Sequence, residues 1–264
     1  MNLPGIALLL SLGLLTATTG HRAIAADLAI VIDDVGYHRE RGLRAVALPA
    51  PITIAILPFT PHSQFLAQQT SQAGKDLIIH QPMEALPSEH VRLEQDTLTT
   101  RMSGSEFDAT IERAIRTVPQ TLGFSNHTGS LLTTRYEHMH RFMRHLNKRG
   151  LFFLDSKTTS ASVADKVAHE LGVTVLKRDV FLDHDRSPEA VLRAYERAIR
   201  VARLKGHAIL VGHPYPITLA FLERALRRTP ADINFVGVGR LVAKRQATPA
   251  RSQDRANPRI SLGQ

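Results

Sequence analysis

Residues 28–34, LAIVIDD, form the stretch that decides the fold. Five apolar residues without polar alternation are typical of a strand with both faces covered, as in a parallel sheet. Two carboxylates inside such a core would be costly, so Asp33 and Asp34 are expected at the carboxyl end of the strand. The carboxyl ends of parallel strands converge on one face of an α/β fold, and active sites form there. The alternative is an ordinary turn, because Asp-Asp-x-Gly is turn-prone.

The same arrangement recurs four more times along the chain. Further apolar runs end in residues that bind metals or move protons, namely His80, Asn126-His127, Asp155 and His213. Chance would spread such residues over both strand ends and the helices, so the pattern predicts a functional site. Taken singly, His80 and His213 are each also compatible with a hydrogen-bonded structural histidine.

Strand and helix patterns alternate through the body of the chain. Strands are expected at 28–33, 52–57, 76–80, 121–126, 151–155, 173–177, 207–211 and 234–238. Helices are expected at 39–48, 61–74, 103–118, 136–149, 162–171, 188–205 and 218–228, and a polar loop over the site face at 81–102. This alternation predicts right-handed crossovers and a parallel sheet. We therefore expect one α/β domain, a distorted (β/α)7–8 barrel with mostly parallel strands.

The two ends of the chain differ from this body. Residues 6–17 are an apolar stretch of signal-peptide length, and residues 23–25 provide a small-x-small cleavage pattern. We expect residues 1–25 to be a signal peptide, residues 26–243 to be the domain, and the protein to be exported to the periplasm, with no stable membrane span after cleavage. Residues 244–264 carry five basic residues and one acid, and are expected to be a disordered tail.

Composition excludes some function classes. The chain has no cysteine, so thiolate metal ligands and cysteine nucleophiles are excluded. The net charge is +9, but aromatic residues are only 5% and tryptophan is absent. A nucleic-acid surface needs basic residues with aromatics for stacking, so nucleic acid is not an expected partner.

The strand-end residues together have the chemistry of a catalytic metal site. One carboxylate and two histidines make an open three-ligand site that leaves a position for water, as catalytic zinc requires. His127 is a good ligand candidate, and Asn126 or Ser130 could orient it. One residue of the Asp33-Asp34 pair could bind the metal while the other acts as a base. Asp155 and Asp183 offer carboxylates that could orient a histidine.

Several strings of residues resemble a known family. Residues 29–37, AIVIDDVGY, resemble the first motif of polysaccharide deacetylases of carbohydrate esterase family 4. Later strings resemble the divergent branch of that superfamily: HQPME at 80–84, NHTGS at 126–130, FLDS at 153–156, RDVFLD at 178–183 and GHP at 212–214. The resemblance covers about residues 28–241. It implies a distorted (β/α) barrel and a metal-dependent hydrolase of N-acetyl groups on glycans, with Asp33 as base, Asp34 as metal ligand and His213 as acid.

The chain departs from the standard family at the metal ligands. The family binds metal with two histidines four residues apart, but Leu131 follows His127 at that spacing and Glu84 follows His80. We expect His80 and His127, on neighbouring strands, to replace the pair and to bind a divalent ion, most simply zinc, together with Asp34. The usual Arg-x-Pro-Tyr substrate motif is also not evident.

Two functions follow as expectations. The first is removal of N-acetyl or related acyl groups from an envelope polysaccharide or peptidoglycan-type glycan, with His213 as acid and Asp155 or Asp183 orienting it. The second is a catalytically inactive glycan-binding or envelope-regulatory protein on the same barrel, which the missing histidine pair favours. A metallophosphatase is a third alternative, but the chain lacks a phosphate-cradling glycine loop.

Overall fold

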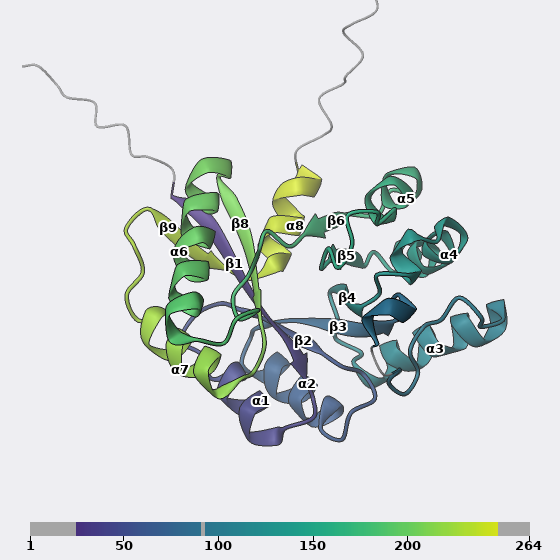
Figure 1. Cartoon of the computed structure of the whole chain (residues 1–264), viewed down its shortest axis with the longest axis horizontal. Coiled ribbons are helices and arrows are strands. Elements are labelled where there is room, and N and C mark those ends of the chain that lie inside the picture. Colours follow the sequence, from purple (N-terminus) through teal and green to yellow (C-terminus); the bar gives the residue numbers. More distant parts are fainter. Residues whose placement is uncertain (1–24, 91–92, 248–264) are drawn as a thin grey trace, which may run out of the picture.

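A curled sheet surrounded by helices makes up the protein (Figure 1). The computed structural model describes residues 25–90 and 93–247. Its strands are β1 (Ala26–Val35), β2 (Thr53–Ile56), β3 (Asp76–Met83), β4 (Gly123–Thr128), β5 (Phe152–Asp155), β6 (Val175–Lys177), β7 (Val180–Phe181), β8 (His207–Gly212) and β9 (Ile233–Val236). Its α-helices are α1 (Arg39–Val46), α2 (Ser63–Gln72), α3 (Gly104–Thr117), α4 (Tyr136–Asn147), α5 (Ala164–Leu171), α6 (Pro188–Lys205), α7 (Pro216–Ala225) and α8 (Val238–Ala247), with short 3-10 helices at Pro87–Glu89 and Leu132–Thr134.

The sheet is parallel and confirms the predicted distorted barrel. Its strand order is β6-β5-β4-β3-β2-β1-β8-β7, and β9 pairs with the first half of β1. The two outer strands, β6 and β7, follow one another in the chain. Between them, the backbone N–H of Arg178 donates to Asp155 and that of Asp179 donates to Ile209. The chain thus crosses from β5 to β8 and bridges the remaining gap in the barrel.

The two faces of the strands belong to different apolar clusters. On β1, Leu28, Ile30 and Ile32 pack outward against the helices, whereas Ala29 and Val31 pack inward with residues of the other strands. This alternation is the two-residue period of a strand. Continued to the carboxyl ends of the strands, this alternation points four residues into the interior: residue 33 of β1, residue 80 of β3, residue 127 of β4 and residue 213 after β8. The two-residue alternation of the strands therefore decides that these four side chains enter the site.

Helix α8 closes the amino-terminal end of the barrel. Val238 and Leu241 pack into the interior cluster, and the backbone N–H of Gly239 donates to Asp76 Oδ2 at the start of β3. Figure 1 shows α8 lying between β8 and β6. The residues of the site lie at the opposite end of the barrel, where the strands end.

Some predicted boundaries were wrong. Strand β3 continues to Met83 instead of ending at His80, because residues 81–83 stay paired with residues 126–128 of β4, and Met83 also pairs with Leu98 of the excursion. Neither β7 nor α8 was predicted, and α8 includes Lys244 and Arg245, the first basic residues of the predicted tail. Residues 1–24 of the predicted signal peptide and residues 248–264 lie outside the described residues. Within the described part of the chain, no helix combines the length and hydropathy needed to cross a membrane.

Candidate metal centre and active site

A bulge in β1 turns two consecutive carboxylates toward the same site. The pairing of β1 with β2 shifts between Ile32 and Val35, so that Asp33 and Asp34 lie opposite one residue of β2. Alternation would direct Asp34 outward, but its φ of 55° is left-handed and breaks the extended conformation. As a result, Nε2 of His80 lies 3.6 Å from Asp33 Oδ2 and 3.2 Å from Asp34 Oδ1. Such local strain is typical of functional sites.

Asp34, His80 and His127 meet at one point. Nδ1 of His127 lies 2.8 Å from Asp34 Oδ1, the same oxygen that faces His80. One potential ligand atom from each residue lies within 4.8 Å of the other two. Among the residues that the structure describes, this is the single cluster of three such groups. The structure thus brings together the three predicted ligands from β1, β3 and β4.

The donor set fits a divalent cation. Asp34 Oδ1 is buried and takes part in no hydrogen bond, although two imidazole nitrogens lie close to it. Buried acceptors are normally hydrogen-bonded, so ring nitrogens that approach a carboxylate without this geometry are arranged like ligands around a common centre. Two nitrogens and one oxygen suit zinc among the common metals, and leave a further coordination position.

The electrostatics keep Asp34 ionised. Burial alone would raise the pKa of Asp34, but His127 and His80 outweigh it and hold the pKa well below its usual value. For His127, burial would lower the pKa, and the carboxylate of Asp34 reverses the direction and raises it. Asp34 is therefore an anion, as a metal ligand must be.

Ser125 holds the ring of His80 from behind. Its Oγ lies 2.7 Å from His80 Nδ1, and the two residues are register partners between β3 and β4. The contact leaves Nε2 of His80 directed at Asp34. Sequence reasoning did not identify Ser125, although its place two residues before His127 put it on the same inward face.

His213 forms a dyad with Asp183. Its Nδ1 lies 2.8 Å from Asp183 Oδ1, while Asp183 Oδ2 accepts hydrogen bonds from the backbone N–H of His213 and the hydroxyl of Thr218. The other ring nitrogen, Nε2, lies 3.7 Å from Asp34 Oδ2. Burial would lower the pKa of His213, but the bond to Asp183 and the charge of Asp34 raise it to about 9. His213 is thus protonated at neutral pH and aimed at the site.

Asp155 does not share this role. Phe153 packs into the outer cluster, so strand alternation gives Asp155 the outward parity. Its carboxylate accepts hydrogen bonds from the backbone N–H of Lys157 and the hydroxyl of Ser162. Of the two predicted orienting carboxylates, Asp183 is the one that contacts His213. Asp155 instead holds the chain at the end of β5.

Asn126 and Ser130, predicted as possible partners of His127, bind the backbone instead. Asn126 Oδ1 accepts the N–H of Ser156, and its Nδ2 donates to the carbonyl of Thr128. Ser130 Oγ accepts the N–H of Leu86. These bonds fix the loops after β3, β4 and β5, which surround the site.

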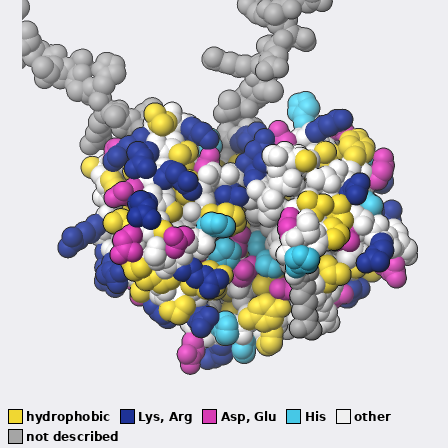
Figure 2. All heavy atoms as spheres, in the orientation of Figure 1, with side chains coloured by type: hydrophobic (Ala, Val, Ile, Leu, Met, Phe, Trp, Pro, Cys, Tyr) yellow, Lys and Arg dark blue, Asp and Glu magenta, His cyan; other side chains and the backbone are white. Residues whose placement is uncertain are grey.

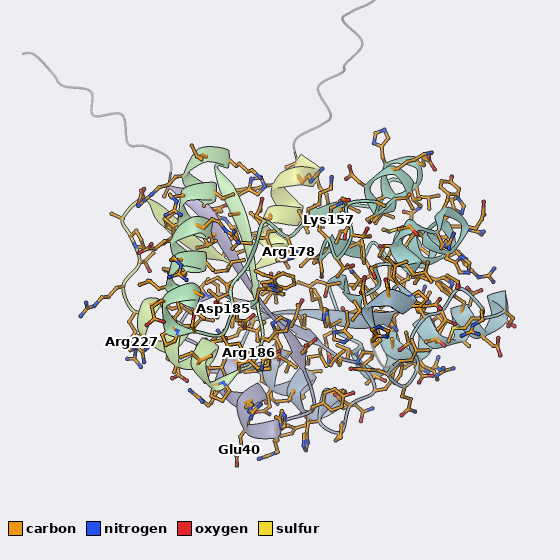
Figure 3. The ribbon with its side chains drawn as sticks, in the orientation of Figure 1. Glu40, Lys157, Arg178, Asp185, Arg186 and Arg227 are labelled. Atoms are coloured by element: carbon orange, nitrogen blue, oxygen red, sulfur yellow. The ribbon has the colours of Figure 1, made fainter. Side chains whose placement is uncertain are left out.

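Two aromatic rings flank the imidazole of His213. Phe181 stacks on it with ring centroids 5.9 Å apart, and Tyr215 lies 5.4 Å away on a tilted plane. Arg178 lies over the ring of Phe181, and Arg186 lies over that of Tyr215. Figure 3 shows both arginines on the stretch between β6 and α6. The sequence contained no signal for this arrangement, because it depends on β7 and β8 pairing.

Asp33 lies beside these groups as a second, different carboxylate. It is buried, its Oδ1 has no hydrogen-bond partner, and burial raises its pKa. A carboxylate of raised pKa, with one oxygen that takes part in no hydrogen bond, can accept a proton. Figure 2 shows the hollow in this face, with histidine and acidic side chains gathered inside it.

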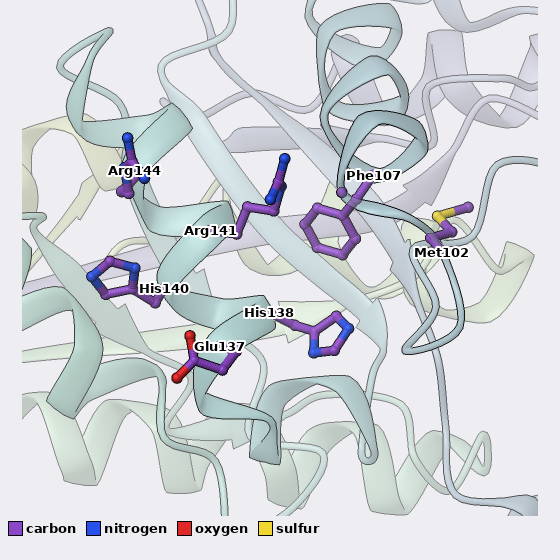
Figure 4. A pocket seen from close by; sticks show the side chains of 8 residues that line it. Met102, Phe107, Glu137, His138, His140, Arg141 and Arg144 are labelled. Carbon is purple, nitrogen blue, oxygen red and sulfur yellow. The ribbon is translucent and has the colours of Figure 1, made fainter.

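A separate surface hollow of about 280 Å³ lies between α3 and α4 (Figure 4). Its lining includes Phe107, His138, His140 and Arg141. It shares no lining residue with the cluster around Asp34. His138 and His140 of α4 therefore belong to a different part of the molecule.

Comparisons with known proteins identify relatives of this chain. A family model described as divergent polysaccharide deacetylase matches residues 30–242. An uncharacterised protein of Haemophilus influenzae is 39% identical over 226 residues, which are 86% of this chain and 80% of that protein. The uncharacterised protein YibQ of Escherichia coli is 35% identical over 235 residues, or 89% of this chain and 73% of that protein.

Solved structures share the fold. The uncharacterised protein ATU2773 of Agrobacterium tumefaciens C58 superposes with a TM-score of 0.74 at 24% identity, covering 83% of this chain and 90% of that one. The peptidoglycan deacetylase PdaC of Bacillus subtilis superposes with a TM-score of 0.51 at 11% identity, covering 84% and 94%. The architecture thus recurs in proteins of very different sequence.

Proposed function

Because the chain belongs to the divergent polysaccharide deacetylase family, we propose that it is a metal-dependent hydrolase that removes N-acetyl groups from an envelope polysaccharide or peptidoglycan-type glycan. The observation that carries the proposal is the meeting of Asp34, His80 and His127 at one point, with Asp33 and His213 beside it. These five side chains provide a ligand set, a base and an acid.

Asp34, His80 and His127 would hold the ion, which we propose to be zinc. When bound, such an ion lowers the pKa of a water molecule and polarises the acyl carbonyl. The protein's part is to hold the ligands rigidly. Asp34 is fixed by the β1 bulge and His80 by Ser125, so little reorganisation is needed when the cation enters.

Asp33 and His213 would move the protons of the reaction. Asp33 accepts a proton from water as the water oxygen attacks the acetyl carbon. His213, protonated and oriented by Asp183, donates a proton to the nitrogen as the C–N bond breaks. The products are acetate and a glycan with a free amine. Tyr215 and Phe181 keep the imidazole plane in place during this transfer.

The glycan class is proposed from the relatives. PdaC is described as a peptidoglycan deacetylase, and it shares the fold of this chain. A glycan of the cell envelope would require export of the enzyme. We propose that residues 1–25 direct this export, since cleavage after Ala25 would leave β1, which begins at Ala26, intact. Amino-terminal sequencing of protein from the periplasmic fraction should begin at Ala26.

Metal analysis combined with acetate release tests the proposed reaction. The purified protein should contain about one zinc per chain and release acetate from acetylated chitooligosaccharides or peptidoglycan. In Asp33→Asn the zinc content should stay the same, while acetate release should fall by at least about 100-fold, the usual contribution of a general base. Equal activity of Asp33→Asn and the unchanged protein would contradict the assignment of the base.

The inactive glycan-binding protein is the competing outcome of the same experiment. Bound zinc without acetate release from either substrate, together with retention of the protein on those glycans, would favour it. The missing histidine pair is the feature of the chain that motivates this alternative.

A further inference from the structure

His127 has a second carboxylate on the side away from Asp34. Its Nδ1 lies 2.8 Å from Asp34 Oδ1, and its Nε2 lies 3.5 Å from Oε1 of Glu94. Glu94 belongs to the excursion between β3 and α3, so it lies outside the strand-end motifs that predicted the site. The two carboxylates thus lie on opposite nitrogens of one imidazole. A cation bound between Asp34 and His127 would take the lone pair of Nδ1, so the proton of the neutral imidazole would lie on Nε2, toward Glu94.

The other histidines of the site follow the same arrangement. His80 directs Nε2 at Asp34 and has Nδ1 against Ser125 Oγ. His213 directs Nε2 at Asp34 and has Nδ1 against Asp183. Each imidazole therefore has one nitrogen toward Asp34 and the other toward an outer oxygen. His127 is reversed, with Nδ1 inward, and this reversal places its outer nitrogen toward the excursion.

The excursion holds Glu94 in place through bonds to the body of the protein. The backbone carbonyl of Glu94 accepts hydrogen bonds from the N–H and the hydroxyl of Thr97. Two residues after Glu94, the carbonyl of Asp96 accepts a bond from Gln81 of β3, and its carboxylate pairs with Arg113 of α3 at 2.6 Å. Glu94 itself is half-buried. A loop that is hydrogen-bonded to β3 and α3 therefore holds the Glu94 carboxylate beside His127.

We propose that Glu94 is a positioning residue that accepts the Nε2 proton of His127 when Nδ1 binds the cation, and so holds the imidazole in the orientation that binding requires. Histidine ligands commonly donate their outer N–H to a carboxylate, which sets the tautomer and the ring orientation. The inference rests on the proposed metal site and adds a residue from outside the resembled motifs. It also gives the excursion a function, since the loop over the site would complete the metal centre.

The Nε2 proton of His127 in the zinc-loaded protein is the decisive measurement. NMR of the imidazole nitrogens should show this proton exchanging slowly with water in the unchanged protein. In Glu94→Ala the proton should exchange faster, and Glu94→Gln, which keeps an acceptor oxygen, should lie between. Glu89→Ala is the matched control, because Glu89 is an exposed glutamate of the same excursion. It should leave the exchange rate unchanged.

Zinc affinity, measured by calorimetry on the same variants, is the second readout. Loss of such an outer partner typically weakens metal binding about 10- to 100-fold, so this loss is expected in Glu94→Ala and not in Glu89→Ala. An unchanged exchange rate of the His127 Nε2 proton and an unchanged zinc affinity in a folded Glu94→Ala variant would overturn the inference, whatever the activity. Absence of acetate release by the unchanged protein would count against the proposed function alone, because neither readout depends on turnover.

Discussion

Nε2 of His80 lies 3.2 Å from Oδ1 of Asp34, although the two residues come from β3 and β1, which are separated in the sheet by β2. The bulge makes this contact possible, because it sets Asp33 and Asp34 opposite a single residue of β2, and the left-handed backbone of Asp34 turns its carboxylate inward. The metal centre therefore depends on one local backbone irregularity as much as on its ligands.

Removal of the Asp34 carboxylate should abolish zinc binding. Asp34→Ala eliminates the oxygen that both His80 and His127 face, and leaves two neutral ligands. We expect less than about a tenth of the zinc content of the unchanged protein, because loss of even an outer partner of a ligand weakens metal binding about 10- to 100-fold. Mass spectrometric metal analysis measures it. Glu40→Ala, which removes an exposed carboxylate of α1 (Figure 3), should keep full zinc, and stoichiometric zinc in Asp34→Ala would refute the ligand assignment.

Loss of the Asp183 charge should lower the pKa of His213. In the metal-free protein this pKa is raised to about 9, so the stabilising contact is fully present below the unfolded value of about 6.5 and is lost as the pH rises through about 9. In Asp183→Asn the histidine should titrate at lower pH by NMR, and the alkaline limb of acetate release should move in the same direction. Thr218→Val removes only a neutral donor to the same carboxylate and should shift the titration less. If His213 titrated at the same pH in Asp183→Asn as in the unchanged protein, Asp183 would not be the group that raises the pKa of His213.

Gly36 should tolerate no side chain. Its φ is 146°, and an added Cβ would lie 1.9 Å from the hydroxyl of Thr60, which is itself held by Leu57 and Ser63. We expect Gly36→Ala to lower the free energy of unfolding by about 2 kcal/mol or more, measured by chemical denaturation. Gly74→Ala, at a left-handed glycine with open space around it, should cost only about 1 kcal/mol. If both variants lost the same free energy of unfolding, the prediction would be wrong, and the Thr60 side chain would have to move away from the added Cβ.

The surface ion pair of Asp108 and Arg141 should stabilise the protein at neutral pH and lose this contribution in acid. The bond from Arg141 lowers the pKa of Asp108 to about 2, so its contribution is present above the unfolded value of 3.8 and is lost as the pH falls through about 2. Because the pair is partly exposed, solvent screening limits it to about 1 kcal/mol. Thermal melts of Asp108→Asn should therefore lie below those of the unchanged protein at pH 7 and converge with them near pH 2. If the difference in melting temperature stayed constant from pH 7 to pH 2, the loss of stability would come from packing and not from the ion pair.

Much of the fold could be predicted from the chain because its signals are local. Apolar runs of strand length alternate with helix patterns, and Gly172 and Gly206 end their helices in the left-handed conformation that stops a helix. The prediction was wrong for the end of β3, because its last residues, Gln81 to Met83, continue to pair with β4 and Met83 also pairs with Leu98 of the excursion. It missed α8, since the charged residues at its end resemble a polar tail more than a helix that caps a barrel.

The sequence by itself determined which residues reach the carboxyl end of the barrel, because strand length and two-residue alternation are written into the apolar pattern of each run. Only the tertiary structure decided which of them touch. It paired His213 with Asp183 instead of Asp155, because a one-residue difference in parity points Asp155 outward. It brought Glu94 to His127 through a loop tied to β3 and α3. Contacts of this kind depend on distances between strands that are far apart in the chain, and no local pattern encodes them.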